Sequence, residues 1–207
     1  MPSFLAGILL VLAVVAVAVQ LALPAYLAGR VESRLEQGGG TAKVHLRAFP
    51  AVALLAGRGG SFEVQGRGLR FGLGERSESP LQRLDGFERV EVTLTELDAG
   101  PLRVGRFELA REGRGEDYDL VVQATSTPRE LAGGLGSAAG GPLGGLLGSL
   151  ASGIAPGAGL ARVPLELQAR VASVSGRPEV VDARGSVAGL SAGPLAGVVL
   201  AVVLDRL

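Results

Sequence analysis

The chain has 207 residues, enough for one ordinary domain with a buried core beside an N-terminal extension. Its 20 basic residues balance 20 acidic ones, so net charge gives no attraction to nucleic acid, which we exclude as a partner. Cysteine is absent, which excludes disulfides, thiolate metal sites and cysteine nucleophiles but leaves the compartment open.

An apolar segment over residues 4–23 begins the chain, and Gln20 is its only polar residue. About 20 apolar residues match the ~30 Å hydrocarbon core of a bilayer. The segment lacks the basic start of a cleaved signal, and its apolar core is longer than a signal needs. We therefore expect an uncleaved transmembrane anchor over residues 1–24 and a domain over residues 25–207, with a cleaved signal as the alternative.

The flanks of this segment bear on the side of the membrane where the domain lies. No Lys or Arg precedes the segment, whereas Arg30 and Arg34 follow it. The positive-inside rule therefore favours a cytoplasmic domain. Two arginines are a weak bias, because large domains translocate largely regardless of charge.

The next residues predict a helix followed by a strand. Leu27, Val31 and Leu35 recur at helical spacing, so the anchor helix should continue into the domain until the glycines at 38–40 end it. Apolar and polar residues then alternate over residues 41–48, which is typical of a strand with one buried face.

Short elements fill the rest of the first half. Pro50 begins a turn or two of helix that Gly57 closes. Further strands are predicted over residues 61–65, 69–73, 89–97, 104–111 and 118–125. Their short connections favour antiparallel pairing.

The second half predicts two more helices around a hairpin. Thr127, Pro128 and Glu130 form a capping box that begins a helix. Alternation over residues 163–171 and again over 181–187 predicts two strands joined by a turn. An apolar helix over residues 194–204 is too short to span a membrane.

Together these elements predict an α+β fold with an N-terminal transmembrane helix. We expect a twisted antiparallel sheet with helices near residues 50–56, 128–154 and 194–204 packed on its concave face.

Residues 131–161 contain no charge and include 11 glycines. Residues 135–154 have six large apolar side chains, against 13 in residues 4–23, so a second membrane span is not expected. Leu143, Leu147, Leu150 and Ile154 fall on one face of a helix that glycine weakens. Two interpretations remain open: a core helix packed closely on the sheet, or a movable apolar wall over a cavity.

Three motifs suggest catalysis or ligand binding but are weak. Residues 189–193 match the G-x-S-x-G nucleophile elbow around Ser191, yet the only histidine, His45, lies far upstream on the polar face of a strand. The glycines of residues 134–140 lie inside a helical stretch and predict no phosphate loop. The acidic residues of 116–119 are typical of a solvated turn. We expect no catalytic residue, metal or cofactor.

The order of elements around VHLRAFPAVALLAGRGGSFEVQGRGLRF resembles the DUF2993, or LmeA-like, family of bacterial envelope proteins. The resemblance rests on a strand, then Phe49 with Pro50, a short apolar helix ending at Gly57, and a second strand. It continues to the final strand pair and apolar helix and covers about residues 24–207. Ala51 stands where the family often has a second aromatic residue, and the middle helix is richer in glycine.

This resemblance implies an exported, membrane-anchored domain on the extracytoplasmic face of the bacterial cytoplasmic membrane, against the arginine bias. It also implies phospholipid binding in an apolar cavity without catalysis. The alternatives are a tethered scaffold without a ligand and, remotely, a serine esterase at Ser191. The candidate lipid-binding residues are Phe49, Pro50, Leu54, Leu55, Leu143, Leu147, Leu150 and Ile154.

Overall fold

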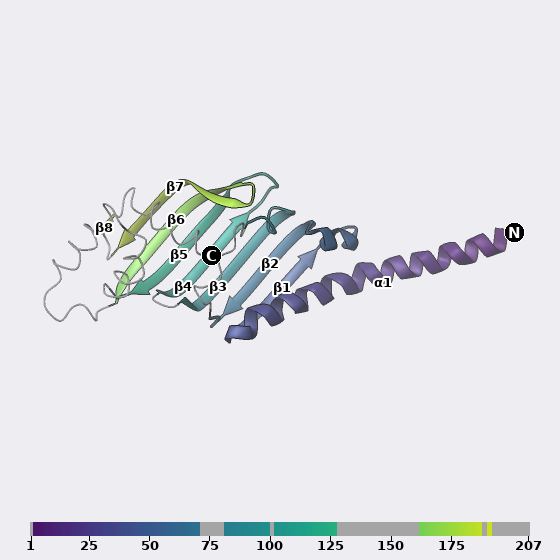
Figure 1. The fold of residues 1–207 in the computed structure, drawn as a ribbon, viewed down its shortest axis with the longest axis horizontal. Coiled ribbons are helices and arrows are strands. Elements are labelled where there is room, and N and C mark those ends of the chain that lie inside the picture. The colour runs from purple at the N-terminus through teal and green to yellow at the C-terminus, as the bar shows by residue number, and fades with distance from the viewer. Residues whose placement is uncertain (1, 71–80, 100–101, 128–161, 188–189, 192–207) are drawn as a thin grey trace.

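The computed structural model describes residues 2–70, 81–99, 102–127, 162–187 and 190–191 (Figure 1). The helices in this part are α1 (Pro2–Leu35) and two 3-10 helices, η1 (Glu36–Gly38) and η2 (Ala51–Ala56). The strands are β1 (Thr41–Arg47), β2 (Gly59–Arg67), β3 (Phe87–Ala99), β4 (Leu102–Arg111), β5 (Tyr118–Ser126), β6 (Val163–Val174), β7 (Arg177–Val187) and β8 (Leu190–Ser191).

The strands form one sheet whose spatial order follows the chain, from β1 at one edge to β8 at the other. Neighbouring strands are antiparallel except β2 and β3, which are parallel. The predicted α+β sheet packed with helix is confirmed, but the prediction of a purely antiparallel sheet is wrong at this pair. The cause is the connection over residues 68–86, which exceeds the dozen or so residues that a parallel crossover needs.

The crossover begins as a continuation of β2. The backbone N–H of Asp98 donates to the carbonyl of Leu69 at 3.0 Å, and Arg70 forms a parallel bridge with Asp98. A strand is predicted over residues 69–73. Residues 69 and 70 are described and pair with β3, and residues 71–73 lie outside the described residues. The predictions for the other strands of the first half, and for the hairpin of β6 and β7, are confirmed.

The sheet has one apolar face and one polar face. Exposed and buried residues alternate along β1, and β6 repeats the pattern. Strand register aligns the apolar positions, as where Val44 pairs with Val64 and Leu120 pairs with Ala169. The predicted alternation therefore builds one continuous apolar face across the sheet.

Helix α1 runs unbroken through Pro24 and lies along β1 before it projects beyond the sheet (Figure 1). Leu27, Val31 and Leu35 pack against the core, so the predicted continuation of the anchor helix into the domain is confirmed. Farther towards the N-terminus, Val17 and Leu21 are exposed. By length and composition, α1 could cross a membrane.

Two carboxylates, one from α1 and one from η1, cover the free edge of β1. Glu32 Oε1 accepts from the backbone N–H of Val44 at 2.7 Å, and Glu36 Oε1 accepts from that of Ala42 at 2.9 Å. Gln20 bonds to the backbone just after β1, as described below. An open strand edge is a template for pairing with another chain, so these carboxylates both stabilise β1 and protect it.

Other expected elements lie outside the described residues. These are most of the helix that begins at Thr127, the helix over residues 194–204, and the glycine-rich stretch over residues 131–161.

We expect Glu32→Ala to lower the free energy of unfolding by about 1 to 2 kcal/mol, because it leaves the partly buried N–H of Val44 without its acceptor. Glu32→Gln retains an acceptor oxygen and should lose much less. Urea unfolding of the full chain in detergent, followed by circular dichroism, measures both. Equal losses in the two variants would contradict the edge-capping role.

Candidate functional site

Two buried clusters occupy opposite ends of the apolar face. The proximal cluster lies at the end from which α1 projects and includes Leu54, Val90, Leu120 and Val171. The distal cluster lies at the other end and includes Val64, Leu69, Leu97, Val104 and Leu165. Leu27 of α1 packs against the proximal cluster and Leu35 against the distal one, so the helix spans both.

Between the clusters, one apolar side chain on each of five strands is only partly buried, and together these side chains form a diagonal across the face. We call it the central band, and it crosses five adjacent strands through Leu46, Phe62, Val92, Phe107 and Val122. Each of these side chains packs against both clusters. Their paired neighbours Leu94 and Leu167 are buried, so the partial exposure belongs to the band itself.

The apolar face is long enough for an acyl chain. On β3 it runs from Val90 in the proximal cluster to Leu97 in the distal cluster. Seven residue steps at about 3.3 Å each give roughly 23 Å. One leaflet of a bilayer contributes half of the ~30 Å hydrocarbon core, or about 15 Å.

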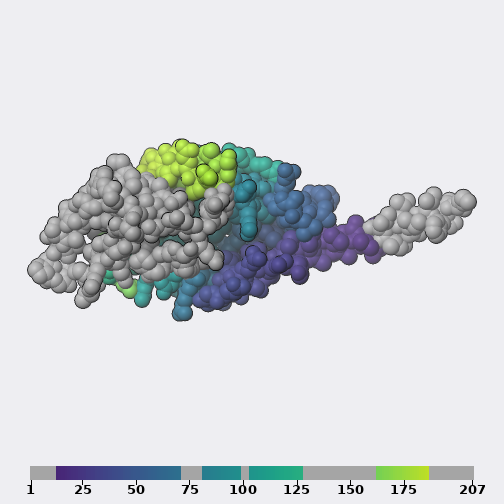
Figure 2. Space-filling model, viewed as in Figure 1, coloured from purple at the N-terminus to yellow at the C-terminus, as the bar shows by residue number. Residues whose placement is uncertain are grey.

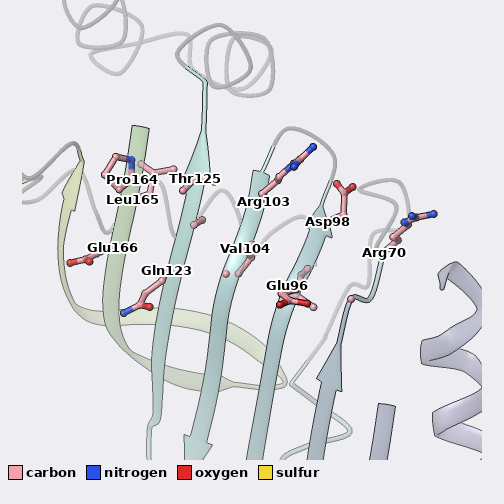
Figure 3. Close-up of a pocket in the computed structure, with 14 residues that line it drawn as sticks. Arg70, Glu96, Asp98, Arg103, Val104, Gln123, Thr125, Pro164, Leu165 and Glu166 are labelled. Atoms are coloured by element: carbon pink, nitrogen blue, oxygen red, sulfur yellow. The ribbon is translucent and has the colours of Figure 1, made fainter. Parts of the chain in front are cut away.

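A pocket of about 650 Å³ opens at the distal end of the face, where β3, β4, β5 and β6 meet (Figure 3). We call it the distal pocket. Leu97, Val104, Ala124 and Leu165 line it and belong to the distal cluster. Ala124 lies two residues from Val122 on β5 and faces the same side of the sheet. Arg103, Thr125 and Glu166 alternate with the apolar lining along their strands and face the other side. The pocket therefore lies at the strand ends, where the two faces of the sheet meet.

Charged side chains surround this apolar lining. Arg70, Asp98 and Arg103 gather at the strand ends, with Glu96 and Glu166 farther down the strands (Figure 3). Glu96 is paired with Arg67 at 2.6 Å, and this pairing lowers the pKa of Glu96. Within the described part of the chain, Arg70 and Arg103 form no ion pair. Their guanidinium groups are free to bind an anion there.

A buried polar cluster closes the proximal end of the face. Arg111 of β4 is 4% exposed, and its Nη1 lies 3.2 Å from Asp85 Oδ1. Arg111 Nη2 donates to the carbonyl oxygens of Leu84 and Phe87. The hydroxyl of Ser173, on β6, donates to Asp85 Oδ2 at 2.6 Å. Arg111 thus fixes the end of the β2–β3 crossover against β4, and Ser173 fixes it against β6.

Tyr118 completes this cluster from β5. Its hydroxyl donates to Asp85 Oδ1 at 2.9 Å, and the Arg111 guanidinium carbon lies 4.6 Å from its ring centroid. Burial raises the pKa of Tyr118, and the hydrogen bond to Asp85 raises it further. The phenol is therefore a neutral structural donor. Because its partners are internal, we assign the cluster to stability.

The structure separates the first four candidate lipid-binding residues. Leu54 is 8% exposed and belongs to the proximal cluster. Phe49 and Leu55 are 91% and 70% exposed, and Pro50 is exposed beside them. These residues do not line one cavity with Leu54. Leu143, Leu147, Leu150 and Ile154 lie outside the described residues.

The serine and histidine of the esterase alternative lie on opposite edges of the sheet. Ser191 is in β8, where it pairs with Ser186, and His45 is exposed in β1. Seven strand spacings separate them, on the order of 30 Å. His45 is therefore too far away to serve as the base for Ser191. In the described ranges, no cluster of His, Asp or Glu could hold a metal ion.

The sequence analysis missed the central band, the two arginines of the distal pocket and the Arg111 cluster. A signal for Arg111 was present, because it has the same strand parity as Phe107 and Leu109 and should face inward. No local signal pairs it with Asp85, which precedes the neighbouring strand β3 and lies 26 residues earlier in the chain. Arg70 and Arg103 come together only through the parallel crossover.

Comparisons with known proteins give no match to a family model, a curated protein or a solved structure. The resemblance to the DUF2993 family therefore stays a prediction.

We expect Arg111→Met to lower the free energy of unfolding by about 3 to 5 kcal/mol, because Asp85 and two carbonyl groups lose their cationic donor. Arg106→Met removes an exposed pair with Glu108 and should cost below about 1 kcal/mol. Chemical unfolding of the full chain in detergent compares the two. A similarly small loss of unfolding free energy in both variants would contradict the structural role of the Arg111 cluster.

Proposed function

We propose that this chain is a membrane-tethered cell-envelope protein that binds a phospholipid and catalyses no reaction. The central band is the observation that carries the proposal. It offers partly accessible apolar side chains across five strands, on a face that runs between two closed clusters. Large apolar side chains that stay partly accessible between buried neighbours support a ligand.

The energetics agree with an acyl chain as that ligand. Each methylene removed from water contributes about 0.8 kcal/mol. A surface that competes with the bilayer must therefore offer apolar contact over most of a chain's length. The partly exposed central band meets that need, because it crosses five strands, and four strand spacings of about 4.8 Å give roughly 19 Å, more than the thickness of one leaflet.

The distal pocket supplies chemistry for a phosphate headgroup. Arg70 and Arg103 are planar donors suited to phosphate oxygens, while Asp98 and Glu166 could face an ammonium group. A volume of about 650 Å³ lies within the usual range of ligand pockets. We infer that the headgroup binds there, at the strand ends, and that an acyl chain passes from the strand ends onto the apolar face, towards the central band.

The rival function is a tethered scaffold without a ligand. The two buried clusters favour it, because they are what any stable sheet requires on its apolar face. A lipid-binding protein should purify with lipid bound against the central band. A scaffold should purify without lipid.

Native mass spectrometry of the full chain, purified from cells in mild detergent, should find bound phospholipid. Val122→Trp fills part of the central band and should reduce the lipid-bound fraction several-fold. Val121→Trp is the matched control, because Val121 lies on the opposite face of the same strand. Overpacking costs about 1 to 3 kcal/mol, so a thermal melt must accompany each variant. Unchanged lipid in a folded Val122→Trp would favour the scaffold.

The double substitution Arg70→Gln and Arg103→Gln tests the headgroup assignment. We expect it to weaken binding of a phospholipid about tenfold or more, since a charge-assisted bond contributes about 1.5 to 3 kcal/mol. Binding of a diacylglycerol with the same acyl chains should change little. Arg106→Gln is the control on the same sheet. Equal weakening of phospholipid and diacylglycerol binding would contradict a headgroup site at Arg70 and Arg103.

The proposed location is the extracytoplasmic face of the cytoplasmic membrane. We expect a C-terminal alkaline phosphatase fusion to be active in bacteria and a fusion to a cytoplasm-dependent fluorescent protein to be dark. The opposite pattern would indicate a cytoplasmic domain, as the flanking arginines favour, and would contradict the envelope role.

A further inference from the structure

The short helix η2 and the residue pair before it present an apolar tip to solvent. We define the η2 tip as Phe49, Val52 and Leu55, which are 91%, 51% and 70% exposed. Ala51 and Leu54, between them, are 1% and 8% exposed. The segment is therefore two-sided, with small or buried residues towards the sheet and large apolar residues away from it.

The η2 tip is fastened to α1 where the helix leaves the body of the protein. The side-chain amide of Gln20 donates to the carbonyl of Ala48 at 2.8 Å, and its oxygen accepts from the N–H of Ala51 at 2.7 Å. Figure 2 shows the surface of this segment, in blue, directly beside the projecting purple helix. The two bonds bracket Phe49 and Pro50.

This attachment sets the depth of the η2 tip relative to the anchor. Gln20 lies inside the apolar segment over residues 4–23, three residues before its end. At 1.5 Å per helical residue, that is about 4 to 5 Å from the end of the apolar segment. If α1 crosses the bilayer, the η2 tip is level with the last turn of the span.

The backbone of this segment is suited to a medium without water. The N–H of Ala53 donates to the carbonyl of Pro50, and the N–H of Gly57 donates to that of Leu54, each at 3.0 Å. Gln20 is the only polar side chain of the apolar segment, and both its amide nitrogen and its amide oxygen form hydrogen bonds with backbone groups. Internal pairing of this kind removes the main cost of placing polar groups at membrane depth.

We propose that the η2 tip inserts into the bilayer leaflet through which α1 emerges, as a second membrane contact beside the helix. The occupant of this surface is lipid hydrocarbon near the headgroups, because the tip continues the exposed apolar surface of α1 represented by Val17 and Leu21. Exposed Arg58 follows the tip and can reach lipid phosphates. The inference rests on the membrane tethering in the proposed function.

A consequence concerns the apolar face. Leu54 belongs to the proximal cluster, one residue before Leu55 of the tip. Insertion of the tip therefore holds the proximal end of the face at the membrane and turns the distal pocket away from it.

Single-tryptophan fluorescence tests this contact directly, because the chain contains no tryptophan. Phe49→Trp and, separately, Leu55→Trp are made in the full chain and reconstituted into phosphatidylcholine nanodiscs. Thr41→Trp is the control, since Thr41 is exposed at the opposite end of the neighbouring strand β1. Each sample is measured with ordinary phosphatidylcholine and with phosphatidylcholine brominated on its acyl chains, after circular dichroism has verified folding.

We expect brominated lipid to quench Phe49→Trp and Leu55→Trp at least twofold, with blue-shifted emission, and to leave Thr41→Trp unchanged. Emission typical of water and quenching by aqueous iodide at both tip positions would overturn the proposal. Native mass spectrometry of the same samples reports bound lipid independently. An unquenched tip with bound lipid would refute membrane insertion alone, whereas a quenched tip without lipid would refute the lipid cavity alone.

Discussion

The structure depends on helix α1, which both provides an apolar segment long enough for a membrane and packs against the sheet. Its first part is apolar enough for a bilayer, yet its last turns pack on the sheet. Glu32 of α1 and Glu36 of η1, which follows directly, satisfy the open edge of β1. Gln20 joins the two parts by bonding to the backbone beside Phe49. Because the helix is continuous through Pro24, the position of the sheet relative to a membrane follows from that of the helix.

The sheet adds a second constraint, since one of its faces is largely apolar. Its proximal end is closed by Leu54 and by the Arg111 cluster, which also holds the crossover that makes β2 and β3 parallel. Its distal end opens into a pocket with Arg70 and Arg103. The central band lies between these two ends, and we propose that it contacts the acyl chain of the ligand.

Local patterns in the sequence predicted much of this fold. Alternation over residues 41–48 and 163–171 predicted strands and their buried faces, and the spacing of Leu27, Val31 and Leu35 predicted where the helix meets the core. These signals depend on neighbours within a few residues. The parallel pairing, the bonds of Gln20 and the Asp85–Arg111 pair depend on residues far apart in the chain, which no local pattern encodes. For the same reason Phe49 and Leu55, grouped with Leu54 by sequence, lie on the other side of η2.

Photocrosslinking with a phospholipid that bears a diazirine near the end of one acyl chain tests lipid binding at the central band most directly. The full chain is irradiated with this lipid in nanodiscs, and the modified peptides are mapped by mass spectrometry. The account expects crosslinks on β3, β4 and β5, near Val92, Phe107 and Val122, that excess unlabelled phospholipid removes. Crosslinks confined to α1 and the η2 tip would contradict it, and the protein would then be a membrane-anchored scaffold.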